Sequence, residues 1–158
     1  MDRDRLRFLR GLNLIYQGLD GRTWRIRPTT APDTSAWPFT PPVFREGVDC
    51  SWVVPAWTGT DIPTTDSYYL LRGIPGMTDA IREGVPDVVL PARLCSKDGS
   101  VQIPAYLLPG HQGALVHGLI KRFELDVVFE WTPQAWVIDS ETLWLHHMGW
   151  KRSRCTKA

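Results

Sequence analysis

The chain has 158 residues, of which 43% are hydrophobic and 22% charged, and its formal net charge is +1 at pH 7. This length and composition predict a single globular domain over residues 1–158 and exclude wholesale disorder. The near-neutral charge excludes a generally basic nucleic-acid-binding protein, and no apolar run reaches the roughly 18 residues of a membrane-spanning helix.

The first third of the chain predicts a short helix, a hairpin and an irregular arm. Residues 3–10 are a helix candidate whose inward residues are Leu6 and Leu9. Residues 12–27 alternate apolar and polar around Asp20-Gly21, a pair typical of a hairpin turn with positive φ. Residues 28–42 contain five prolines and predict a tethered arm rather than regular structure.

The middle of the chain predicts further strands and a second hairpin. Strands are expected at residues 51–55 and 67–72, and a short helix at residues 78–83. Residues 88–95 and 100–107 form the arms of the second hairpin, with its turn at residues 96–99. Because Pro91 and Pro104 each remove a ladder donor, we expect edge-like or bulged strands whose open backbone is available to another chain.

The last third predicts the principal helix at residues 112–123, weakened by two glycines. It is followed by an alternation of polar and apolar residues at residues 124–131, which predicts a strand, and by a turn into a strand at residues 135–138. Residues 140–148 are compatible with a helix or a strand, and a helix is favoured. Residues 151–158 are expected to be a basic tail.

Together these elements predict a β-rich α+β fold. Strand patterns outnumber helix patterns, and no βαβ unit repeats. The sheet should be mainly antiparallel, either twisted or a partly closed barrel, with one principal helix at about residues 112–123 across it.

The three cysteines, at positions 50, 95 and 155, have no metal-binding spacing and are odd in number. They predict no disulfide framework and no zinc site. With no signal-peptide pattern at the start, we expect a cytoplasmic protein in the producing cell. We expect no cofactor and no metal.

Eight tryptophans dominate the composition. Those in strand patterns, Trp24, Trp52, Trp131 and Trp136, are expected in the core. Those in loops or near the terminus, Trp37, Trp57 and Trp150, are equally compatible with local packing and with an interface. The full set of interface candidates is Trp37, Phe39, Trp57, Trp150, Arg152 and Arg154.

Catalytic candidates are few. His111 and His117 lack the spacing of a helical metal motif, although a joint site with Glu124 and Asp126 stays open. The alternative is that the histidines are partly exposed polar residues and that the acidic residues are the solvated face of a strand. Residues 109–113 superficially match a phosphate-binding loop but lack its lysine, so a plain loop-to-helix turn is favoured.

Both ends of the chain are basic. Residues 1–27 hold seven arginines against three aspartates, and residues 151–157 carry four positive charges. Solvated termini would account for this pattern, as would head-to-tail contact between copies or contact with a polyanion.

Two segments within residues 12–50 are Leu14-Ile-Tyr-Gln-Gly-Leu-Asp-Gly-Arg-Thr-Trp-Arg-Ile26 and, downstream, Arg45-Glu-Gly-Val48. Together they resemble the opening strands of actinobacteriophage minor (distal-tail-like) tail proteins. The resemblance implies an oligomeric, β-rich tail part and transfers no catalytic residues. It covers no more than about a quarter of the chain.

We therefore expect a non-enzymatic structural or assembly protein of a multi-subunit complex, with a phage tail or neck as a setting and the virion as a location. Its partners should be proteins, including copies of itself. Nucleic acid is expected only at the basic termini, and membrane contact is not expected. Two alternatives stay open: a small hydrolytic or metal-assisted enzyme using His111 and His117, and a one-to-one inhibitor or immunity-type protein.

Overall fold

The computed structural model describes residues 3–18, 21–30, 50–58, 62–63, 74–84, 89–141 and 144–155. The strand predicted at residues 67–72 lies outside the described residues. So does most of the proline-rich arm, with Trp37 and Phe39.

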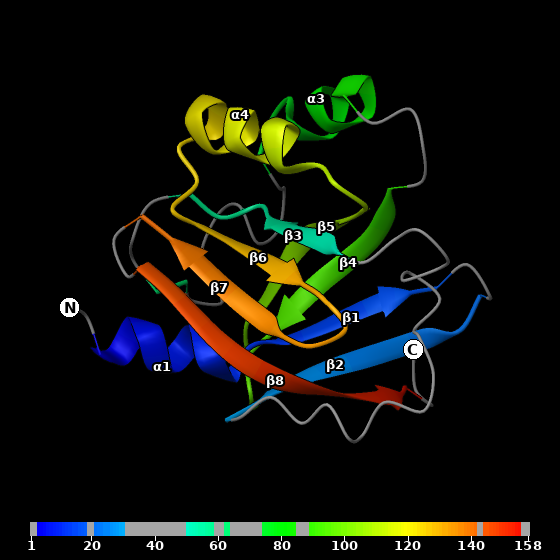
Figure 1. Ribbon diagram of the computed structural model, residues 1–158, viewed down its shortest axis with the longest axis vertical. Helices are drawn as coiled ribbons and strands as arrows, with labels where there is room; N and C mark the ends of the chain where they lie inside the picture. The colour runs from blue at the N-terminus through cyan, green and yellow to red at the C-terminus, as the bar shows by residue number, and fades with distance from the viewer. Residues whose placement is uncertain are drawn as a thin grey trace.

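Eight antiparallel strands close into a barrel in the order β1-β2-β8-β7-β6-β3-β5-β4, and β4 pairs back to β1 (Figure 1). The strands are β1 (Asn13–Gln17), β2 (Thr23–Thr29), β3 (Ser51–Pro55), β4 (Leu90–Cys95), β5 (Gln102–Pro109), β6 (Val127–Trp131), β7 (Trp136–Ser140) and β8 (Trp144–Arg154). The helices in the described residues are α1 (Arg3–Gly11), α3 (Met77–Gly84) and α4 (Gly113–Phe123). The predicted β-rich α+β class is confirmed, and the barrel is fully closed.

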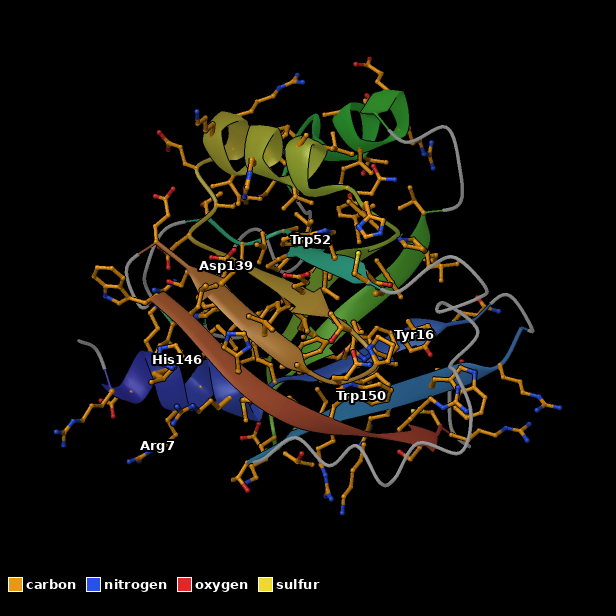
Figure 2. The ribbon with its side chains drawn as sticks, viewed as in Figure 1. Arg7, Tyr16, Trp52, Asp139, His146 and Trp150 are labelled. Carbon is orange, nitrogen blue, oxygen red and sulfur yellow. The ribbon has the colours of Figure 1, made fainter. Side chains whose placement is uncertain are left out.

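The barrel interior is packed with aromatic rings. Phe129 stacks on Trp136 with ring centroids 5.1 Å apart, and Trp131 meets Trp150 edge-on at 5.1 Å. The ring of Tyr16 lies 5.6 Å from that of Trp131, and Figure 2 shows Tyr16 and Trp150 inside the barrel. Since each such ring removes about 150–250 Å² from water on burial, these contacts contribute much of the core's stability.

The helix α1 packs against the barrel, as Figure 1 shows in blue. Its Leu6 and Leu9, three residues apart, share one helix face and belong to the same buried cluster as the barrel interior. Phe8 lies edge-on to Trp57, with ring centroids 6.0 Å apart. The predicted inward residues of this helix are confirmed.

The helices α3 and α4 lie together outside the barrel, near β3 and β5 (Figure 1). A second buried cluster joins them to the outward side chains of the strands, including Trp52 of β3 and Val128 of β6. Val116 and Leu119 are the buried residues of α4. Strand β6 is therefore apolar on both faces at this point, because Val128 interrupts the alternation of its sequence.

The expectation of edge strands in the second hairpin is wrong. Strand β4 pairs with both β1 and β5, and β5 pairs with both β3 and β4. A residue's backbone N–H points toward only one neighbouring strand, so Pro91 and Pro104 each remove one ladder donor and leave the other side of the strand intact. Closure of the barrel removes the open backbone that the sequence suggested.

The helix predicted at residues 140–148 is also wrong. Strand β7 ends at Ser140 and β8 begins at Trp144. The first part of β8 pairs with β7 and the second with β2. Met148 and Trp150 alternate into the core along β8, so this burial and the pairing of residues 144–148 with β7 override the local helical tendency.

The predicted basic tail at residues 151–158 is not simply a tail. Its first four residues, 151–154, complete β8 and pair with β2. The backbone of Cys155 continues this pairing, because its N–H donates to the carbonyl of Thr23 at 2.9 Å.

Candidate functional site

His111 lies in the turn between β5 and α4 and is exposed. Its Nδ1 is 3.5 Å from the Sγ of Cys50, just before β3. The thiol also donates to the carbonyl oxygen of Gly110 at 3.3 Å. Cys50 is buried, and its contact with His111 was not expected because 61 residues separate the two.

His117 lies on the exposed side of α4, and its electrostatic effect is on the carboxyl group of Asp139. Burial raises the pKa of Asp139 on β7, and the charge of His117 opposes that rise. Figure 2 shows Asp139 on β7, on the side of the barrel near α4. His117 is therefore within electrostatic range of Asp139, a residue that the sequence had not singled out.

Asp126 belongs to a buried ion pair. Its Oδ2 lies 2.5 Å from the guanidinium of Arg5 on α1 and accepts a hydrogen bond from the Ser140 hydroxyl at 2.9 Å. The two charged side chains are 2% and 7% exposed. Arg5 also lies over the ring of Trp57, 5.3 Å from its centroid. The solvated acidic strand face predicted from the sequence is thus wrong at Asp126.

Glu124 is the residue at which helix α4 ends. It has a left-handed backbone, φ 55°, and its N–H donates to the carbonyl of Ile120. The four catalytic candidates therefore take part in separate local arrangements. Within the described ranges, no group of three or more His, Cys, Asp or Glu residues could hold a metal ion.

Backbone N–H groups in the turn at residues 109–113 form hydrogen bonds with backbone carbonyls of the protein. The N–H of Gly110 donates to the carbonyl of Cys50 at 2.9 Å, and that of Gln112 donates to the carbonyl of Gly110 at 3.0 Å. Gly110 has φ 96°, a conformation that suits glycine. Two of the amides that could have faced an anion are used internally, which favours the plain loop-to-helix turn.

Two predicted interface tryptophans are core residues. Trp57 is 0% exposed and Trp150 is 5% exposed, and both belong to the barrel cluster. The indole N–H of Trp150 donates to the carbonyl of Thr132 at 2.9 Å. Arg152 is half-buried, with its guanidinium 4.1 Å from the centroid of the Trp24 ring, whereas Arg154 is exposed.

An exposed apolar pair at the start of β8 was missed by the sequence reading. Trp144 is 73% exposed and Leu145 58% exposed. Trp144 also has a left-handed backbone, φ 71°. The only available signal was the apolar Trp-Leu pair itself, and the predicted helix over these residues obscured it.

All three cysteines are free thiols, and Cys50 and Cys95 are buried. The helices in the described ranges are all too short or too polar to cross a membrane. The chain matches no protein-family model, and no curated protein or solved structure resembles it at a significant level. The class that the fold defines is a closed eight-stranded antiparallel barrel with flanking helices.

Proposed function

We propose that the protein is a non-enzymatic subunit that self-associates in a larger assembly, with a phage tail or neck as the setting. The observation that carries this proposal is the exposed pair Trp144 and Leu145. Tryptophan is the side chain most enriched among residues that dominate binding energy at protein interfaces. An exposed tryptophan beside an exposed leucine supports a protein contact at this end of β8.

The backbone of Trp144 adds to this argument. A bulky residue in the left-handed region is a rare conformation, and such conformations cost about 1–3 kcal/mol. Glycine or asparagine would adopt it with less strain. The ring is therefore held outward at an energetic cost, which contact with a second copy would offset.

The phage setting rests on the resemblance of residues 12–50 to actinobacteriophage minor tail proteins. In that setting the subunit is made in the cytoplasm of the producing cell and ends in the virion. A barrel whose interior is occupied by its own aromatic rings agrees with a role as a rigid building block.

Sedimentation velocity over a range of protein concentrations tests the self-association. The wild-type protein should form a dimer or larger species, and Trp144→Asn should remain monomeric. Because asparagine tolerates this backbone, the same substitution should leave the unfolding free energy unchanged or raise it by about 1 kcal/mol. His147→Ala, an exposed position on the same strand, is the control and should associate like the wild type.

A wild-type protein that is monomeric at every concentration contradicts this proposal. Loss of association in both the Trp144 and the His147 variants also contradicts it, because the effect would then not be specific to the apolar pair. A stable one-to-one complex with a different protein, formed by such a monomer, would instead support the inhibitor or immunity-type alternative.

A second candidate function is favoured by the contact between Cys50 and His111. A cysteine beside a histidine is the arrangement of a thiol nucleophile and its base. The hydrogen bond from the Cys50 thiol to the Gly110 carbonyl argues against it, because it holds the proton on sulfur.

Iodoacetamide labelling followed by mass spectrometry tests this candidate. An activated Cys50 should be alkylated faster than Cys95, whose pKa is raised by burial and which serves as an internal control. The rate at Cys50 should fall in His111→Ala. Equal, slow labelling of both cysteines would exclude a thiol nucleophile at this position.

A further inference from the structure

Two segments from opposite ends of the chain form one surface on the barrel. Strand β2 pairs with the second half of β8 (Figure 1). In this register Arg27 lies directly opposite Lys151 and Arg25 opposite Ser153. These four side chains are exposed, whereas Ile26, between the two arginines, is fully buried in the barrel. Because side chains alternate along a strand, both arginines point outward.

The surface continues across two more strands. Ile15 of β1 lies opposite Arg25 of β2 on one side and opposite Arg93 of β4 on the other. Ile15 is only 5% exposed, although it shares the outward side with the two arginines. Arg25 is exposed and Arg93 is half-buried, and the long stems of such arginines cover apolar neighbours. We call Arg25, Arg27, Arg93 and Lys151 the basic face.

No acidic residue balances this surface within its own strands. Strand β2 supplies Arg25 and Arg27, β4 supplies Arg93 and β8 supplies Lys151, whereas the sequences of β1, β2, β4 and β8 contain no Asp or Glu. The whole chain has a formal net charge of only +1, so this face is more basic than the chain as a whole. The concentration is a property of the fold, since β2 and β8 are more than a hundred residues apart.

The pair Arg27 and Lys151 is unfavourable in the isolated protein. Like charges directly opposite each other on neighbouring strands destabilise a sheet. An anion bound over the pair would remove the repulsion. This feature therefore points to an anionic partner rather than to a surface that serves solubility alone.

The shape of the basic face selects the kind of anion. Residues i and i+2 of a strand are about 6.8 Å apart and neighbouring strands about 4.8 Å apart, so the cations form a two-dimensional array that needs several anionic groups. Apart from Trp144 at the far end of β8, no exposed Trp, Tyr or Phe lies on the described residues of these four strands. Such a surface lacks a platform on which single-stranded bases would stack.

We infer that the basic face binds the phosphodiester backbone of a double-stranded nucleic acid without reading its sequence. Phosphate contacts from arginine and lysine position a protein on a duplex and carry no sequence information. This inference does not depend on the proposed self-association, which uses the opposite end of β8.

Fluorescence anisotropy with a labelled random-sequence DNA duplex, and with the RNA duplex of the same sequence, tests the inference. Each phosphate contact contributes about −0.9 to the slope of log K against log salt concentration for B-DNA, so four contacts give a slope of about −3.6. A second, unrelated DNA sequence should bind equally well. Tighter binding of one duplex type would identify DNA or RNA as the source of the backbone.

The double substitution Arg27→Gln/Lys151→Gln is the decisive variant. It should reduce the magnitude of the slope by about 1.8, as expected for the loss of two contacts. Its unfolding free energy should be unchanged or higher, because the like-charge pair is gone. Lys121→Gln, which removes an exposed cation from α4, is the matched control and should leave the slope unchanged.

Three results would overturn the inference. The first is a wild-type protein with no salt-dependent duplex binding. The second is an equal loss of slope in the Lys121 control. The third is self-association that disappears in the double variant while duplex binding is absent throughout, which would assign the basic face to an acidic surface of a second copy.

Discussion

Arg5 illustrates how the surroundings of a single residue decide its role. In the sequence it is one of several arginines near the start of the chain, and Arg7 on the same helix does point into solvent, as Figure 2 shows. Arg5 instead lies on the side of α1 that carries Leu6 and Leu9 and is 1% exposed. A buried charge requires a partner, and Asp126 supplies it across the barrel wall.

Arg5→Met should destabilise the protein by about 3–5 kcal/mol, because it leaves the Asp126 carboxylate buried without its partner. Urea denaturation measures this difference. The double substitution Arg5→Met/Asp126→Leu should recover most of the loss, since apolar replacement of both partners of a buried pair is often neutral or stabilising. A cost below about 1 kcal/mol for Arg5→Met would show that the pair is effectively solvated.

Asp139 should make stability fall as pH rises. Its folded-state pKa is raised by burial, so the folded protein holds the proton more tightly than the unfolded chain does. The resulting stabilisation is present below the unfolded pKa of about 3.9 and is lost as pH increases through the folded value. Asp139→Asn should therefore raise the thermal midpoint at neutral pH and flatten this part of the pH profile.

Asp98 should have the opposite effect and provides the comparison. The side-chain hydroxyl and backbone N–H of Ser100, and the hydroxyl of Ser96, donate to its carboxylate and lower its pKa to about 2. Its contribution to stability is present above the unfolded pKa and is lost as pH falls toward about 2. Asp98→Asn should lower the midpoint at neutral pH and remove this acid dependence, as pH-dependent thermal scans would measure. An identical response of the Asp98 and Asp139 variants would contradict both assignments.

At the scale of the elements, glycines have two different effects in this fold. Gly99 closes the turn between β4 and β5 with φ 76°, and its N–H donates to the carbonyl of Ser96 at 2.9 Å. Gly118 lies within α4 with an ordinary helical backbone, and an added Cβ would meet nothing within 4 Å. The turn at Gly99 requires glycine because its φ is positive. At Gly118 nothing requires glycine, and its presence only lowers the stability of α4.

Alanine at the two glycines should therefore change stability in opposite directions. Gly118→Ala should stabilise the protein by about 0.5–1 kcal/mol through the higher helix propensity of alanine. Gly99→Ala should destabilise it by about 1–2 kcal/mol, because alanine is strained at positive φ. Chemical denaturation of both variants checks the pair, and changes of the same sign would contradict the assigned roles.

At the scale of the whole molecule, the barrel depends on pairings between distant parts of the chain. The registers β1–β4 and β2–β8 join residues about 80 and 126 positions apart. Four of the six pairs between β2 and β8 involve residues 151–154, which the sequence had assigned to a basic tail. The end of the described chain is thus part of the barrel wall.

Truncation after Trp150 should therefore open the barrel between β2 and β8. We expect loss of a cooperative thermal transition or a markedly lower midpoint, measured by circular dichroism, because the backbone of β2 loses most of its partners on that side. Truncation after Cys155 removes only residues outside the described part of the chain and serves as the control. A truncation after Trp150 that melts like the full chain would restore the interpretation of a dispensable tail.

Local patterns in the sequence determined most of the elements. Alternation of apolar residues located β1, β2, β5 and β6, and the spacing of apolar residues located α1 and α4. These signals are local, since a strand or helix face is defined by residues a few positions apart. They also predicted a mainly antiparallel, β-rich fold.

The tertiary structure alone decided which elements became neighbours. Backbone hydrogen bonds are the same for every sequence, so alternation does not specify the partner of a strand. The start of β8 was predicted to be helical and its end a tail, whereas pairing with β7 and with β2 defines both as one strand. For the same reason the burial of Trp150, the exposure of Trp144 and the pairing of Arg5 with Asp126 were not readable from the sequence. The meeting of Arg27 with Lys151 depends on barrel closure, because only the long-range β2–β8 register joins the two basic ends of the chain.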